Sequence, residues 1–130
     1  MHIQKPLILI FLICILSLLL RIYLLDKIPN SISADEAAFG YNAYSILKTG
    51  KDEFGHKYPL YFQSFDDYKN PLFGYLLIPF VKFFGLTEWS IRLPSVLLGV
   101  GVILIIYLLV KKLTGKNRLA LITSFFAAIT

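Results

Sequence analysis

Two adjacent acidic residues, Asp35 and Glu36, are the first candidates for chemistry in this 130-residue sequence. They follow Ser33-Ala34, and Ser-x-x-Glu is a capping box, in which Ser33 and Glu36 bond each other's backbone N–H groups. One interpretation is therefore structural, because acids in the first turn of a helix stabilise it by about 0.3–1 kcal/mol. The other is a carboxylate that the helix N-terminus keeps ionised, so that it can accept a proton as a general base. From the residues alone, both interpretations stay open.

Two basic residues are also of interest for their charge. Lys69 precedes Asn70 and Pro71, and Arg92 stands at the start of an apolar run. Lysine and arginine side chains in general can bind an anion through a charge-assisted hydrogen bond. The alternatives are a solvated loop lysine at position 69 and, at position 92, an arginine that extends its charge toward the membrane interface.

A second acidic pair, Asp66-Asp67, raises the question of a metal site, because carboxylates suit Mg²⁺ or Mn²⁺. Adjacent acids on an irregular loop are more often a solvated turn, however. His56 is the other plausible ligand, and it stands alone earlier in the chain. We therefore predict no metal site and no cofactor. Binding of a divalent ion stays an open alternative.

The composition indicates a membrane protein. Apolar residues make up 57% of the chain and charged residues 16%, against about 45–50% and 25% in soluble domains. All eight acidic residues lie within 26–88 together with six lysines, so this segment has a net charge of −2. The other seven basic residues flank or end apolar runs, which is a signal of membrane topology and not of nucleic-acid binding.

Two apolar runs are long enough to cross a bilayer. Residues 6–25 carry one charge, Arg21, and residues 93–110 form the second run, with Pro94 expected in its first helical turn. Twenty helical residues match a hydrocarbon core of about 30 Å. The first run is too long for the apolar part of a cleaved signal peptide, about 7–15 residues, which favours a membrane anchor. Residues 119–130 begin a third apolar segment that is too short to span.

The charges around these runs predict a topology. Residues 111–118 hold four basic residues and no acid, which indicates a cytoplasmic loop in a multi-pass protein of the cell membrane. The predicted segments are a cytoplasmic start with the first transmembrane helix (1–25), an extracytoplasmic loop (26–91), the second transmembrane helix (92–110), a cytoplasmic loop (111–118) and the start of a third transmembrane helix (119–130).

The predicted outer loop is expected to be helical. Its capping box opens a helix over 34–48, and Gly50 supplies the C-terminal stop. Residues 71–87 are apolar, but a crossing there would move the basic loop at 111–118 to the outside. We therefore predict an amphipathic segment at the outer interface. Of the 20 aromatic residues, 15 lie within 39–89, which supports this location because aromatic rings prefer the interface.

Three motifs, taken together, resemble a known family. They are Ala34-Asp35-Glu36-Ala37, then Tyr68-Lys69-Asn70-Pro71-Leu72 with Tyr75, and finally Phe84-Gly85-Leu86 followed by Arg92-Leu93-Pro94-Ser95. In this order around one outer loop they resemble the front end of membrane glycosyltransferases of the protein O-mannosyltransferase and lipid A aminoarabinose transferase type. The resemblance covers about residues 6–130.

The resemblance implies an all-α integral membrane fold of GT-C type, of which this sequence is the N-terminal part: two transmembrane helices, the start of a third and a helical outer loop with the active site. It implies transfer of a sugar, with inversion, from a polyprenyl-phosphate donor to a protein, lipid or glycan acceptor. By position, Asp35 is the candidate catalytic base and Glu36 its neighbour in the catalytic pair. Lys69 matches a residue expected to bind the lipid phosphate, and Arg92 is a second candidate for that role.

A non-enzymatic membrane protein is the alternative, either a small one or a subunit of a lipid-carrier transporter. The acidic residues would then only shape a surface. For the enzyme, the expected partners are the lipid-linked sugar, the bilayer and an acceptor, and not nucleic acid. Two spans leave helix faces that normally pack on further helices, so we expect the segment alone to be inactive.

Overall fold

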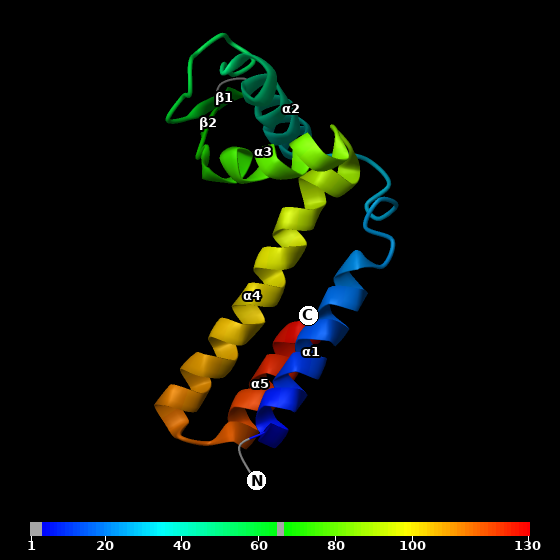
Figure 1. The fold of residues 1–130 in the computed structure, drawn as a ribbon, viewed down its shortest axis with the longest axis vertical. Coiled ribbons are helices and arrows are strands. Elements are labelled where there is room, and N and C mark those ends of the chain that lie inside the picture. The colour runs from blue at the N-terminus through cyan, green and yellow to red at the C-terminus, as the bar shows by residue number, and fades with distance from the viewer. Residues whose placement is uncertain (1–3, 65–66) are drawn as a thin grey trace. The chain divides into compact units, whose positions relative to one another are not determined.

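The computed structural model describes residues 4–64 and 67–130. Over these residues the chain forms five α-helices and one short hairpin (Figure 1). Their bounds are α1 (Gln4–Ile22), α2 (Ala34–Thr49), β1 (Phe62–Ser64), β2 (Asp67–Lys69), α3 (Leu72–Phe84), α4 (Glu88–Thr114) and α5 (Asn117–Ile129). The helical membrane class predicted from the sequence is confirmed, and the hairpin is an addition that was not predicted.

The chain divides into two compact units. A helix unit combines Met1–Tyr23 with Ser95–Thr130, and a loop unit consists of Leu24–Pro94. Every candidate site residue named above lies in the loop unit, apart from Asp66, which falls outside the described residues.

The helix unit contains α1, most of α4, and α5. Its buried core is formed by Ile10 of α1, Ile103 and Tyr107 of α4, and Ala120 of α5. Figure 1 shows α5 running beside α1. Within the described part of the chain, α1 and α4 are the helices long and apolar enough to cross a membrane, as predicted, whereas α5 is apolar but has 13 residues.

Helix α4 begins earlier than the apolar pattern predicted, because Thr87 caps it. The Ser90 N–H donates to Thr87 Oγ1 (3.3 Å), and the Thr87 N–H donates to Ser90 Oγ (3.1 Å). The helix therefore starts at Glu88. The expectation that Pro94 lies in the first turn was wrong: it lies in the second, where its ring nitrogen cannot donate to the Ser90 carbonyl.

The predicted helix over 34–48 is confirmed as α2. The Glu36 N–H donates to Ser33 Oγ (3.2 Å), and the Ser33 N–H donates to Glu36 Oε2 (2.9 Å), which completes the capping box. Gly50 ends the helix with φ of 70° and donates its N–H to the Ile46 carbonyl. That left-handed conformation favours glycine, which has no Cβ to clash.

Helix α3 packs against α2 to form the core of the loop unit. Ala43 of α2, Leu77 and Val81 of α3, and Ile91 of α4 are its buried members. Within the apolar segment 71–87, residues Leu72–Phe84 form this helix. Its place at the membrane interface stays a prediction.

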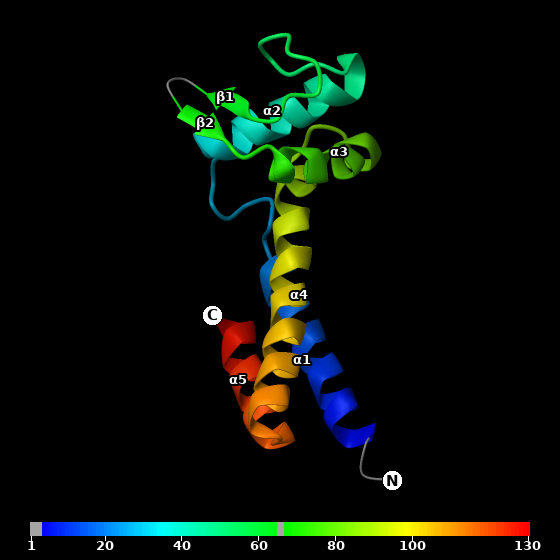
Figure 2. The same ribbon diagram turned by 90° about the vertical axis from the view of Figure 1, so that its left-hand side faces the viewer.

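The hairpin lies beside α2 and packs on it through one aromatic residue (Figure 2). Phe62 of β1 pairs with Lys69 of β2 in an antiparallel register. The Phe62 side chain is buried and meets the ring of Phe39 on α2 edge to face, with the ring centroids 6.3 Å apart. The Tyr75 hydroxyl of α3 donates to the Pro59 carbonyl (2.9 Å) and so holds the chain just before the hairpin.

Candidate active site

Helix α2 and strand β2 bring Asp35 and Lys69 together. Asp35 lies in the first turn of α2, with its side chain 73% exposed, whereas the Lys69 side chain, at the end of β2, is 14% exposed. The Lys69 ammonium donates to Asp35 Oδ1, although the two residues are 34 positions apart in the sequence. The folded chain therefore presents an accessible carboxylate next to a largely buried cation.

An aromatic ring helps to hold the Lys69 ammonium in place. Lys69 Nζ lies 5.8 Å from the centroid of the Phe39 ring. Phe39 follows Asp35 by one helical turn, so both groups come from the same side of α2. A cation over an aromatic face gains about 0.5–1 kcal/mol at exposed sites. Lys69 is thus held by two contacts with α2.

Glu36 and Arg92 form a second ion pair. Arg92 Nε donates to Glu36 Oε1 (2.8 Å), and one terminal Arg92 nitrogen reaches Glu36 Oε2 (3.4 Å). The hydrogen bond from Arg92 lowers the pKa of Glu36 below its ordinary value, and the capping bonds with Ser33 act in the same direction, against the effect of burial. Glu36 is therefore a bound, ionised group and not a free base.

Arg92 makes further contacts inside the protein. Its guanidinium donates to Glu88 Oε2 (3.5 Å) and to three backbone carbonyls, those of Leu25 (2.8 Å), Pro29 (3.3 Å) and Ser31 (3.2 Å). The Arg92 side chain is 7% exposed. It joins the segment after α1 to the first turns of α2 and α4, and each of its nitrogens has a protein partner.

The structure thus sorts the four predicted site residues into two pairs, Asp35 with Lys69 and Glu36 with Arg92. Sequence reasoning missed Glu88, the further acidic partner of Arg92. The sequence signal was their spacing. Glu88 and Arg92 are four residues apart on one helix, and side chains at that spacing lie next to each other.

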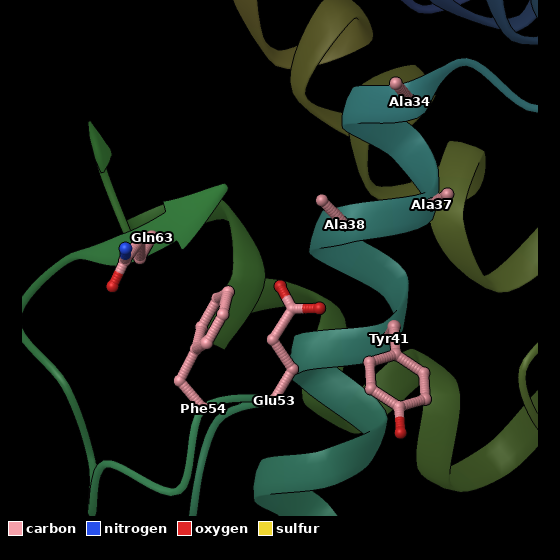
Figure 3. A pocket seen from close by; sticks show the side chains of 7 residues that line it. All are labelled: Ala34, Ala37, Ala38, Tyr41, Glu53, Phe54 and Gln63. Carbon is pink, nitrogen blue, oxygen red and sulfur yellow. The ribbon is translucent and has the colours of Figure 1, made fainter. Parts of the chain in front are cut away.

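A cavity of about 600 Å³ lies on the side of α2 next to this site (Figure 3). Its lining residues are Ala34, Ala37, Ala38, Tyr41, Glu53, Phe54 and Gln63. Sequence reasoning did not identify this cavity, which depends on the path of the chain between α2 and β1.

No group of three or more histidine, cysteine or acidic residues is placed to hold a metal ion among the residues that the structure describes. The pair Asp66-Asp67 falls at the edge of that range. Asp66 lies outside it, and only the backbone of Asp67 is described. The prediction of no metal site stays untested.

Comparison with known proteins adds a family to this geometry. Residues 68–130 match the family of dolichyl-phosphate-mannose-protein mannosyltransferases, a range that includes Lys69 and Arg92 but not the acidic pair. A protein of Bacillus subtilis (strain 168) that is named as a mannosyltransferase, YkcB, is 49% identical over 47 residues. Both matches are thus to proteins described as mannosyltransferases, and each covers less than half of this chain. No solved structure matches the chain.

The two long apolar helices, α1 and α4, have the length and composition that fit a membrane location. The match to the Bacillus relative covers 36% of this chain and 6% of that protein's length. The chain therefore corresponds to a small part of the relative.

Proposed function

We propose that this chain is the N-terminal part of a membrane glycosyltransferase that moves a sugar from a polyprenyl-phosphate donor to a hydroxyl group of a protein, lipid or glycan acceptor. The observation that carries the proposal is the Asp35–Lys69 pair, a carboxylate and a cation held side by side by α2 and β2. The mannosyltransferase family supplies the reaction class.

Asp35 is the base in this proposal. It takes the proton from the acceptor hydroxyl while the acceptor oxygen forms a bond to the anomeric carbon of the sugar. The bond between that carbon and the phosphate oxygen breaks, and the electron pair leaves with the polyprenyl phosphate. Attack from the face opposite the phosphate inverts the anomeric carbon. The high exposure of Asp35 leaves room for an acceptor to approach it.

Lys69 binds the donor phosphate in this proposal. An anionic phosphate competes with Asp35 for the Lys69 ammonium, since both form charge-assisted hydrogen bonds with it. Donor binding then loosens the ion pair and frees the carboxylate of Asp35 to accept a proton. The same cation stabilises the charge that stays on the leaving phosphate.

Glu36 and Arg92 position the base instead of touching substrate. Both carboxylate oxygens of Glu36 are engaged by Arg92 and the Ser33 backbone. Arg92 is largely buried against Glu36, Glu88 and backbone carbonyls, which argues against the phosphate contact expected from its sequence position. We propose that this network fixes the first turn of α2 and thereby the place of Asp35.

The predicted topology is part of this proposal. The segment 26–91 lies outside the cytoplasm and the loop 111–118 lies inside it. The apolar runs before and between them cross the membrane, and residues 119–130 begin a third crossing. This order accounts for the four basic residues in 111–118. In this topology the acidic pair and Lys69 belong to the outer loop, in which the resemblance implies the active site.

The test is Asp35→Asn in the full-length protein, since the asparagine keeps the size of the side chain and removes the base. Transfer from a polyprenyl-phosphate-linked mannose should fall by about 10²–10⁴-fold, whereas binding of that donor should stay near normal. Lys69→Ala should instead weaken donor binding, because it removes the cation that contacts the phosphate.

Two exposed residues of the same loop unit supply matched controls. Asp26→Asn and Lys48→Ala remove the same charges away from the Asp35–Lys69 pair and should leave transfer and donor binding unchanged. Near-normal transfer by Asp35→Asn would leave Asp35 with the structural role of an acid that stabilises the first turn of α2, and it would sink the catalytic assignment.

A further inference from the structure

We infer that the cavity beside α2 is a binding site for one hexopyranose ring. The inference rests on the proposed function, since it names a substrate class for the same region, but it stands on its own set of residues. The cavity volume of about 600 Å³ falls within the range of small-molecule sites, about 300–1,000 Å³.

Alanines on one face of α2 keep the cavity open. Ala34, Ala37, Ala38 and Tyr41 follow the i, i+3, i+4, i+7 spacing that places side chains on one side of a helix. The first three contribute only methyl groups. A larger residue at any of these positions would occupy the space directly.

A buried asparagine fixes the main polar group of the cavity, Glu53. Asn42 is 1% exposed. Its Nδ2 donates to Glu53 Oε1 (2.9 Å), and its Oδ1 accepts the Glu53 backbone N–H (3.1 Å). The carboxylate is thus held by one oxygen, and Oε2 has no hydrogen-bond donor among the residues that the structure describes. That oxygen can accept a ligand hydroxyl.

The remaining lining groups suit a ring that carries several hydroxyls. Phe54 and Tyr41 are 52% and 50% exposed, so their rings offer apolar surface to the C–H face of a sugar. The Gln63 amide supplies both a donor and an acceptor. Figure 3 shows Glu53 and Phe54 between Gln63 and α2. A purely apolar ligand would desolvate the Glu53 carboxylate without replacing its hydrogen bonds, at a cost in free energy.

The cavity is bounded by the two elements that carry the proposed catalytic pair. Ala34 directly precedes Asp35, and Gln63 pairs in the hairpin with Tyr68, the neighbour of Lys69. The hexose can therefore belong to the lipid-linked donor or to a glycan acceptor. Both sources present the same ring chemistry to the cavity.

The first experiment measures binding of methyl α-D-mannopyranoside to the full-length protein in nanodiscs, by saturation-transfer NMR. Ala38→Leu fills the cavity, and Glu53→Gln keeps the Asn42 bond but removes the charge. Each should weaken binding about ten-fold or more, since hydrogen bonds to charged groups are among the strongest. Tyr44→Ala is the control, because it removes a partly exposed aromatic ring of α2 outside the cavity.

The second experiment separates the two sources of the hexose. Weaker binding of polyprenyl-phosphate-linked mannose, with unchanged binding of sugar-free polyprenyl phosphate, assigns the cavity to the donor sugar. A raised KM for a glycan acceptor with unchanged donor binding assigns it to the acceptor. Wild-type behaviour of both cavity variants in every assay, or binding of simple amines in place of the mannoside, overturns the inference.

The two proposals fail in distinguishable ways. Loss of mannoside binding in Glu53→Gln together with normal transfer by Asp35→Asn would keep the cavity and reject the base. Loss of transfer in Asp35→Asn with no effect of either cavity variant would keep Asp35 as the base and reject the cavity as a sugar site.

Discussion

Asp35 and Glu36 are neighbours in the sequence, yet their surroundings give them different chemistry. Successive helical residues point in directions about 100° apart, so one carboxylate meets Lys69 and the other meets Arg92. The Asp35 side chain is mostly exposed, whereas both carboxylate oxygens of Glu36 accept hydrogen bonds from protein donors. Only Asp35 is therefore placed to act on a substrate.

Arg92→Met should destabilise the protein by about 3 kcal/mol, because it leaves Glu36 and Glu88 without their cation. The measurement is thermal or denaturant unfolding of the full-length protein in detergent. Lys82→Met, at an exposed lysine of α3, is the matched control and should change stability little. Equal stability of the two variants would mean that Arg92 is free for another role.

The lowered pKa of Glu36 predicts a dependence of stability on pH. Because its folded-state pKa lies below the ordinary value of 4.5, ionised Glu36 contributes stability that is present in full above about pH 4.5. That contribution is lost as the pH falls below 4.5 and through the folded-state pKa. The wild-type chain should therefore lose more stability than Glu36→Gln between pH 5 and pH 3, as about that window is where the group protonates. If stability fell equally with pH in the two proteins, the lowered pKa of Glu36 would be contradicted.

Among the elements, α3 and the hairpin depend on close approach at a glycine. A Cβ at Gly74 of α3 would lie 2.1 Å from Phe62 Cε2. Phe62 is buried and already touches Phe39 and Tyr75, so its ring has no room to turn away. The contact between α3 and the hairpin therefore requires glycine at this position.

Gly74→Ala should destabilise the chain by about 1–3 kcal/mol, as overpacking of a core does. In an open helical position the same substitution would stabilise by up to about 1 kcal/mol. Gly101→Ala in α4 provides that comparison, because no other part of the described chain comes within 4 Å of an added Cβ there. Comparing the Tm of each variant with that of the wild type checks the sign of its stability change. A Gly74→Ala protein as stable as the wild type would show that the hairpin can move.

For the molecule as a whole, the proposed topology makes a prediction about access from outside the cell. In a Cys14→Ser background, Leu60→Cys in the loop unit should react with an impermeant maleimide in intact cells. Lys116→Cys, in the basic loop, should react only after the membrane is opened. Leu60 is 87% exposed, and Lys116 is exposed as well, so burial would not mask either label. Labelling at position 116 and not at 60 in intact cells would reverse the topology.

Local signals in the sequence were sufficient for much of the fold. Ser33, Glu36 and Gly50 predicted the ends of α2 because a capping box and a left-handed glycine act within one turn of the chain. The apolar runs predicted α1 and α4 because length and hydropathy alone decide whether a helix can cross a bilayer. The hairpin was missed, since strands of three residues are too short for a periodic pattern.

Only the tertiary structure decided how the site residues are paired. The sequence by itself determined which residues carry charge and which helix end bears the acidic pair. It did not determine that Lys69 reaches Asp35 across 34 positions, or that Arg92 binds a carbonyl 67 positions away at Leu25. Such contacts depend on how α2, α3 and the hairpin pack, because a side chain interacts with what the folded backbone brings within a few ångströms of it. Capping and hydropathy are properties of neighbouring residues, whereas an ion pair between distant segments is a property of the packed chain.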